Sequence, residues 1–168
     1  MVRRFKLFAG VFPFIIIFVA YLFSISWWNV YFNAVSDLGN PTYCLASALV
    51  LDIGFVLSGF LFFYYSVRYC SGFGSLLFSI VSIFLALVGA IDEVFGLAHF
   101  IISVLFFLSM AVFVLYYGIL RRDVLIFSWF SICVVLWVLH FGYHVPPGAA
   151  IPELVSAGLG VYTFIRYL

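Results

Sequence analysis

Long apolar runs separated by short polar breaks dominate the chain. The uncharged stretches cover residues 7–36, 53–67, 69–91, 94–120 and 124–152. A helix needs about 20 apolar residues to cross the ~30 Å hydrocarbon layer of a membrane. The runs therefore predict six membrane-spanning helices, near residues 7–26, 43–67, 73–91, 95–119, 124–143 and 149–167.

The breaks between these runs are short, except for residues 27–42. Short connections place consecutive helices side by side and antiparallel. The expected fold is an all-α, polytopic membrane protein, in which residues 1–168 form a single antiparallel bundle. The first run is longer than the apolar region of a signal peptide, so we expect it to remain as a membrane helix.

The composition agrees with a membrane protein. Hydrophobic residues make up 68% of the chain and charged residues only 8%, whereas soluble domains carry about 25% charged residues. The net charge of +1 argues against nucleic acid as a partner.

All seven basic residues fall at the same ends of the predicted helices. They are Arg3, Arg4, Lys6, Arg68, Arg121, Arg122 and Arg166. Lys and Arg are retained on the cytoplasmic side of membrane proteins. The pattern therefore predicts a multi-pass protein of the cell membrane with both termini in the cytoplasm.

Acids and histidines gather at the opposite, outer ends. The residues that we expect in this polar cluster are Ser36, Asp37, Asp92, Glu93, His99 and Glu153. No Lys or Arg is predicted there, so a ligand should be a cation or a proton rather than a phosphate. Histidines and carboxylates are also metal ligands, and the candidate metal set is His99, His140, His144 and Glu153.

A purely structural interpretation competes with that site. Asp37 would cap a turn, Asp92 and Glu93 would be solvated turn residues, and His99 and Glu153 would bond each other between helices. Asp52 is a separate intramembrane acid, expected about ten residues into its helix near the bilayer centre. Because an isolated charge there is costly, it should be neutral or hydrogen-bonded, for example to Ser82.

Small residues predict one close helix contact. Ser75, Ser79, Ser82 and Ala86 share one face of the third predicted helix, and Gly54, Ser58 and Gly59 form a notch on the second. Small residues let helix backbones approach closely inside a membrane. We therefore expect the second and third helices to pack tightly against each other.

Three segments together resemble a known membrane family. They are Asn33-Ala34-Val35-Ser36-Asp37-Leu38-Gly39, the segment from Ala98-His99 to Phe107, and Ile151-Pro152-Glu153-Leu154. The chain looks like a member of the family called domain of unknown function 998, over nearly its whole length. The resemblance implies a six-helix membrane protein without an established activity, and it singles out Ser36, Asp37, His99 and Glu153. His140 and His144 match no motif of the family, and Asp52 stands where an amide is expected.

Three functions remain open from the sequence. The first, which we favour, is a non-enzymatic membrane subunit or accessory bundle whose outer polar cluster holds helices together. The second is a metal-dependent membrane hydrolase acting on an outer-leaflet lipid, with a divalent metal as cofactor. The third is a haem or quinone site that uses His99 and His140. The expected partners are membrane lipid and other membrane subunits.

Overall fold

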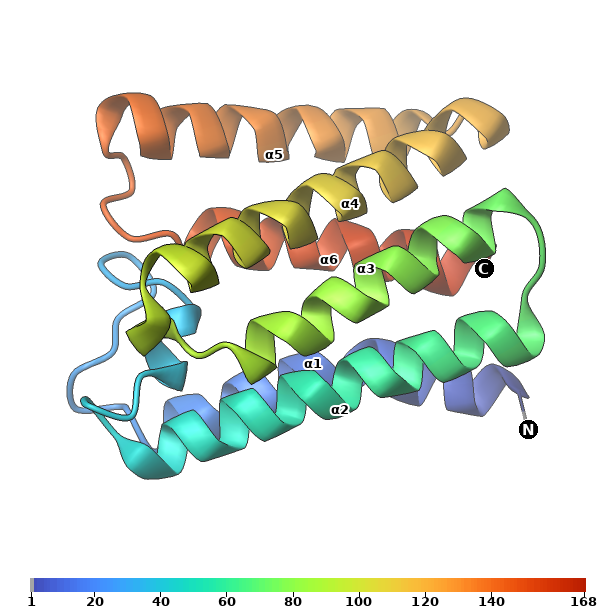
Figure 1. Cartoon of the computed structure of the whole chain (residues 1–168). Coiled ribbons are helices and arrows are strands. Elements are labelled where there is room, and N and C mark those ends of the chain that lie inside the picture. Colours follow the sequence, from blue (N-terminus) through green and yellow to red (C-terminus); the bar gives the residue numbers. More distant parts are fainter. Residues whose placement is uncertain (1) are drawn as a thin grey trace.

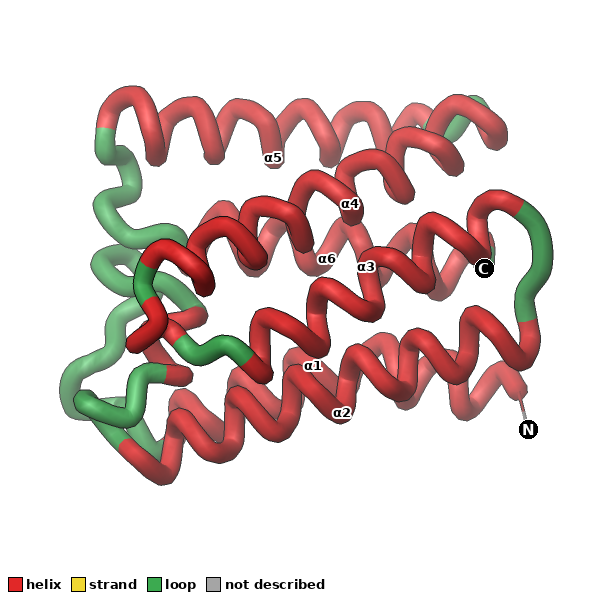
Figure 2. Tube along the Cα trace, viewed as in Figure 1, coloured by secondary structure: helices red, strands yellow, loops and turns green. Residues whose placement is uncertain are grey.

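Six α-helices form an antiparallel bundle in the computed structural model, which describes residues 2–168 (Figure 1). The helices are α1 (Val2–Leu22), α2 (Leu45–Tyr69), α3 (Phe73–Ala90), α4 (Leu97–Arg121), α5 (Val124–Tyr143) and α6 (Ala150–Tyr167). Two short 3-10 helices, η1 (Ser36–Gly39) and η2 (Glu93–Phe95), lie in the connections. The described part of the chain contains no strand (Figure 2). The predicted all-α fold is confirmed.

Five of the six helices in residues 2–168, α1 to α5, are long and apolar enough to cross a membrane. α6 is also long, but it is less apolar because it carries Glu153, Ser156, Thr163 and Arg166. It packs against α1, α4 and α5, and its Ser156 and Thr163 are buried. Protein surrounds this helix over much of its length, so it does not need the apolar surface that lipid demands. The chain is an integral membrane protein.

The first helix differs most from its predicted range of 7–26. It already includes Arg3, Arg4 and Lys6 and ends at Leu22, after which residues 23–27 form turns. The predicted helix began after the last of these basic residues. Arg and Lys are good helix formers, however, so they do not end a helix.

α2 and α3 make the most extensive helix contact in the bundle. A Cβ atom at Gly59 would lie 2.6 Å from the backbone oxygen of Ser82 and 2.7 Å from the Cβ of Ala86. Beyond Gly59, the Ser66 hydroxyl donates to the backbone oxygen of Ser75 at 2.7 Å. The tight packing predicted from the small residues is therefore confirmed.

Phenylalanine rings join the helices at the centre of the bundle. Phe78 of α3 stacks on Phe164 of α6 with ring centroids 4.6 Å apart. Phe62 of α2 and Phe113 of α4 pack on Phe78 at 5.1 and 4.9 Å. Four helices thus meet in one aromatic core, which fixes the position of α6.

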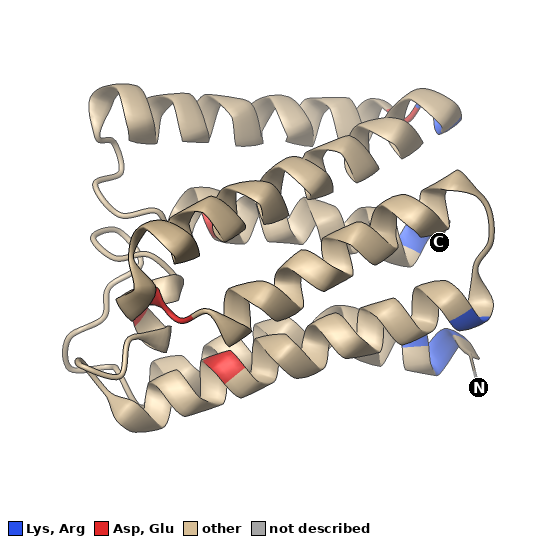
Figure 3. Cartoon of the chain, in the orientation of Figure 1, with Lys and Arg blue, Asp and Glu red and all other residues tan. Residues whose placement is uncertain are grey.

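The bundle has two ends of opposite charge (Figure 3). We call one the cation end: it holds both chain termini and the seven basic residues named above. We call the other the carboxylate end: it holds η1, η2 and Asp37, Asp52, Asp92, Glu93 and Glu153. The sixth acid, Asp123, lies at the cation end.

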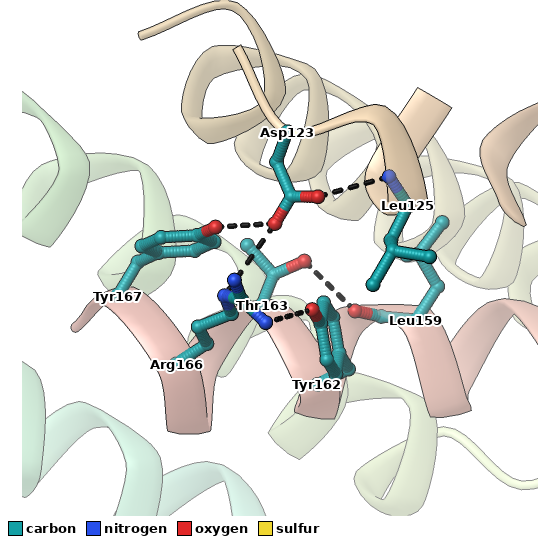
Figure 4. A network of polar contacts seen from close by, with 7 residues as sticks. All are labelled: Asp123, Leu125, Leu159, Tyr162, Thr163, Arg166 and Tyr167. Carbon is teal, nitrogen blue, oxygen red and sulfur yellow. Dashed lines mark hydrogen bonds and ion pairs between the residues drawn. The ribbon is translucent and has the colours of Figure 1, made fainter. Parts of the chain in front are cut away.

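Asp123 joins α5 to α6 there (Figure 4). Its carboxylate accepts hydrogen bonds from the Tyr167 hydroxyl and from the Leu125 amide, the latter at 2.9 Å, and lies 3.5 Å from Arg166 Nε. Arg166 also donates to the Tyr162 hydroxyl at 2.6 Å. Asp123 was not among the residues predicted from the sequence, although an Asp directly before an apolar run is a helix-start signal.

We expect Asp123→Asn to lower the thermal midpoint by several degrees, because it removes the ion pair with Arg166. The Tyr167 hydroxyl and the neighbouring Arg166 hold the pKa of Asp123 below its usual range. An acid with a lowered folded-state pKa stabilises the fold above its unfolded pKa of about 4, and this contribution disappears on further acidification. The variant should lack that acid-dependent loss in melting curves recorded across the acid range.

Tyr167→Phe gives the matched test of the same contact. The two substitutions should be less than additive, because Tyr167→Phe removes the hydrogen bond that Asp123→Asn weakens by removing the charge of the acceptor. Strict additivity in the double variant would show that Asp123 and Tyr167 do not stabilise the protein through each other.

Candidate functional site

The segment that follows α1 is shaped by its own side chains. Trp28 Nε1 donates to the backbone oxygen of Ala34 at 2.7 Å. The Asp37 carboxylate accepts from Asn33 Nδ2 and from the Ala34 amide, both at 2.9 Å. These bonds close a compact turn over residues 28–37 and fix the position of η1 at the carboxylate end.

Glu153 ties α6 to that turn. Its Oε2 atom accepts the Val35 amide proton at 2.6 Å across 118 residues of sequence. The two chains also pair through their backbones, because Gly148 N donates to Tyr31 O at 3.0 Å and Ala150 N donates to Asn33 O at 2.9 Å. The second oxygen of Glu153 accepts no hydrogen bond from residues 2–168, so it remains open to a ligand.

Glu93 reaches the same turn from η2. Asn40 Nδ2 donates to its Oε2 atom at 3.2 Å, and its carboxyl group hydrogen-bonds with that of Asp37. Burial, the contact with Asp37 and the nearby Asp92 raise the pKa of Glu93 to about 7, although the Asn40 bond opposes them. A hydrogen bond between two carboxyl groups needs a proton on one of them, and the raised pKa of Glu93 favours its protonated form.

His99, on the first turn of α4, is 7% exposed. Its Nδ1 atom lies 2.5 Å from the backbone oxygen of Ile91, and its Nε2 atom 3.2 Å from Ser103 Oγ. Because a carbonyl oxygen only accepts, Nδ1 carries a proton and donates it to Ile91. His99 thus closes the α3–α4 connection, and it bonds neither Asp37 nor Glu153.

A large cavity lies between α4, α5 and α6. Its volume is about 1000 Å³, it is partly open, and most of its lining is apolar. On α4 it extends from His99 to Val114, which is ~22 Å along the helix. The polar groups in its wall gather near the carboxylate end: Ser36, Glu93, His99, Ser103, His140, Glu153 and Ser156.

A smaller interior cavity of about 90 Å³ adjoins the first, and Ser36 and Glu153 line both. Its other walls are mainly apolar side chains of α1 to α4 and α6, such as Phe14, Phe55 and Phe113. Ser36 and Glu153 therefore place polar groups where two mainly apolar cavities adjoin.

The remaining predicted residues lie elsewhere. Asp92 accepts from the Val94 amide at 2.9 Å and caps η2. α2 begins at Leu45, so Asp52 lies seven residues after the helix start instead of the expected ten. Asp52 lies under Gly39, whose Cβ would be 2.7 Å from its Oδ1. The predicted partner of Asp52, Ser82, donates to Phe78 O at 2.6 Å.

The four candidate metal ligands do not form a set. No three His, Cys, Asp or Glu side chains within residues 2–168 are grouped so that they could hold a metal ion. His140 Nδ1 donates to Pro146 O at 2.9 Å. α5 ends at Tyr143, and His144 takes a left-handed backbone conformation, so the two histidines do not share a helix face. His99 and Glu153 line the same cavity but make separate hydrogen bonds.

The segments that build this end of the bundle are also those that indicated a family. The family model described as "Protein of unknown function (DUF998)" matches residues 8–165. The chain belongs to the DUF998 family. No curated protein and no solved structure matches it. In this DUF998 protein, the Asn33–Gly39 segment, the start of α4 and the first turn of α6 meet around the two cavities.

Proposed function

We propose that this DUF998 protein is a non-enzymatic membrane protein that binds one long-chain amphiphile between α4, α5 and α6. The apolar cavity with polar groups near one end carries the proposal. An amphiphile has the same asymmetry, with a long apolar chain and a polar head. The cavity volume of about 1000 Å³ is at the upper end of the usual range for ligand sites.

The hydrogen bonds at the carboxylate end favour binding over catalysis. Glu153 holds Val35, Asp37 holds Ala34, and His99 holds Ile91. Each group already has a structural partner that fixes two segments of chain to each other. A metal-dependent hydrolase would need several ligands around one ion, and no group of three such side chains lies within residues 2–168. Haem ligation would need His99 Nε2, which faces Ser103.

A cavity-filling variant tests the proposal. Ala111 lines the cavity, whereas the next residue, Val112, is 53% exposed on the outer surface of α4. We expect Ala111→Trp to reduce crosslinking of a photoreactive long-chain alcohol roughly tenfold, a free-energy change of about 1.4 kcal/mol. Val112→Trp should leave it unchanged, and equal crosslinking in both variants would overturn the proposal.

We also propose that the protein lies in the cell membrane with the cation end in the cytoplasm. All seven Lys and Arg residues at one end support this orientation. Single cysteines at positions 40 and 122, in a chain whose Cys44, Cys70 and Cys133 are replaced by alanine, should label from opposite sides of intact cells. Labelling of both from the same side by an impermeant maleimide would contradict the orientation.

A further inference from the structure

We infer that the head group of the bound amphiphile is a hydrogen-bond donor, an amine or an alcohol, and that it lies against Glu153 and Ser36. This inference rests on the proposed lipid-binding function and adds the chemical class of the ligand. It depends on which polar atoms face the cavity and on which charges are absent from that end.

The free polar atoms there mainly accept hydrogen bonds. Glu153 uses one oxygen for the Val35 amide, and its second oxygen accepts nothing from residues 2–168. Ser36 Oγ has no hydrogen-bond partner in the same part of the chain, and it lines both cavities. His140 keeps Nε2 unbonded after Nδ1 donates to Pro146. A head group with N–H or O–H donors matches these acceptors.

The distribution of charged residues also favours a head group that donates hydrogen bonds. Glu93 and Glu153 line the cavity, and Asp37, Asp52 and Asp92 lie at the same end. Every Lys and Arg lies at the other end of the bundle. A phosphate or carboxylate head would meet carboxyl groups and none of the Arg or Lys donors that normally bind such anions. An ammonium group would be attracted, and a hydroxyl group would be tolerated.

The apolar part of the cavity explains why the ligand is a lipid rather than a free cation. The whole cavity extends for ~22 Å along α4, and its α4 wall is apolar beyond Ser103. Its walls include Phe107, Met110 and Trp137. A free metal ion would gain nothing from this surface, whereas an alkyl chain would bury its length there.

A chain-matched series of ligands tests the head group alone. Hexadecylamine, hexadecanol and hexadecanoate share one alkyl chain, so the cavity contributes equally to all three. We expect purified protein in nanodiscs to bind the amine most tightly, the alcohol next and the carboxylate at least tenfold more weakly than the amine. Equal binding of the three would overturn the head-group inference while leaving the proposed function standing, and binding of none would overturn the proposed function.

Glu153→Gln identifies the residue that selects the head. The amide keeps an oxygen for the Val35 bond but loses the charge, so binding of the amine should fall about tenfold and approach that of the alcohol. Asp92→Asn is the matched control, because Asp92 is an acid of the same end that does not line the cavity. If Glu153→Gln binds the amine as the parent does, or if Asp92→Asn loses as much, Glu153 does not select the head group. Should Glu153→Gln fail to fold, Ser36→Ala replaces it: weaker alcohol binding supports the inference and unchanged binding overturns it.

Discussion

Gly148→Ala is expected to destabilise the protein by about 1–3 kcal/mol, which is the usual cost of forcing extra atoms into a packed region. A Cβ atom at Gly148 would overlap the backbone of Phe32 and Asn33. Those atoms belong to backbone, not to the end of a flexible side chain, so one of the two chain segments must move. The thermal midpoint in detergent measures the loss.

The same substitution should loosen the carboxylate end. Gly148 N and Ala150 N donate to the backbone of residues 31 and 33, and the adjacent turn holds Glu153 through Val35. Hydrogen exchange of these two donor amides should accelerate in Gly148→Ala. Exchange at the parent rate would mean that the two chain segments adjust to the added Cβ atom without breaking these two hydrogen bonds.

Gly142→Ala is the control for Gly148→Ala. Gly142 lies inside α5, and its added Cβ would meet no atom within 4 Å. Alanine favours helix over glycine by up to about 1 kcal/mol, so this variant should be as stable as the parent or more stable. A comparable loss in both variants would show that the added methyl group acts through something other than the contact with Asn33.

The fold could be predicted because its two main determinants are written in the sequence. Runs of about twenty apolar residues have few alternatives to a membrane helix. The cations then fall at one end of an antiparallel bundle, as Figure 3 shows. The contact of Gly59 with Ser82 could also be predicted, because small residues at helical spacing indicate that two helices approach each other closely.

The hydrogen-bond partners within the site were harder to predict from the sequence. The sequence predicted that Asp37, His99 and Glu153 would converge, and the structure brings Asp37 and Glu153 to the same turn. His99 bonds the backbone of Ile91 instead. A backbone carbonyl is present at every residue, so residue types give no signal for that choice.

The cavity was not predictable from the sequence. It depends on α5, which packs on α6 through contacts such as the Trp129 Nε1 bond to Val155 O, and which touches α4 less. A uniformly apolar helix such as α5 carries no pattern that says which face meets protein and which meets lipid. The separation between helices is therefore a property of the assembled bundle.

Glu93→Gln is expected to remove a pH dependence of stability between about pH 4.5 and pH 7. Burial and the contact with Asp37 raise the pKa of Glu93 from 4.5 to about 7. The charged and polar groups that face it are Asp37 of η1, Asn40 of the following loop and Asp92 of its own connection. None of them is a cation that would stabilise the ionised form.

The sign follows from the order of proton release. Below pH 4.5 the folded and unfolded states both keep the proton, and Glu93 costs nothing. Between pH 4.5 and pH 7 the unfolded state has lost its proton while the folded state holds it, so stability falls as the pH rises. Above pH 7 the ionised group is destabilising by about 1–2 kcal/mol, after allowance for solvent around this half-buried side chain.

Glu93→Gln keeps the size of the side chain and a donor for Asp37, but it cannot ionise. We expect the variant and the parent to melt at similar temperatures at pH 5, and the variant to melt higher at pH 8. The other ionisable groups are the same in both proteins, so their contribution cancels in the difference. The infrared intensity of protonated carboxyl groups at pH 6 should be lower in the variant than in the parent, because the variant lacks the Glu93 carboxyl group. If the two proteins show equal intensity, or if their melting temperatures differ by the same amount at pH 5 and pH 8, Glu93 is not protonated in the folded protein at pH 6.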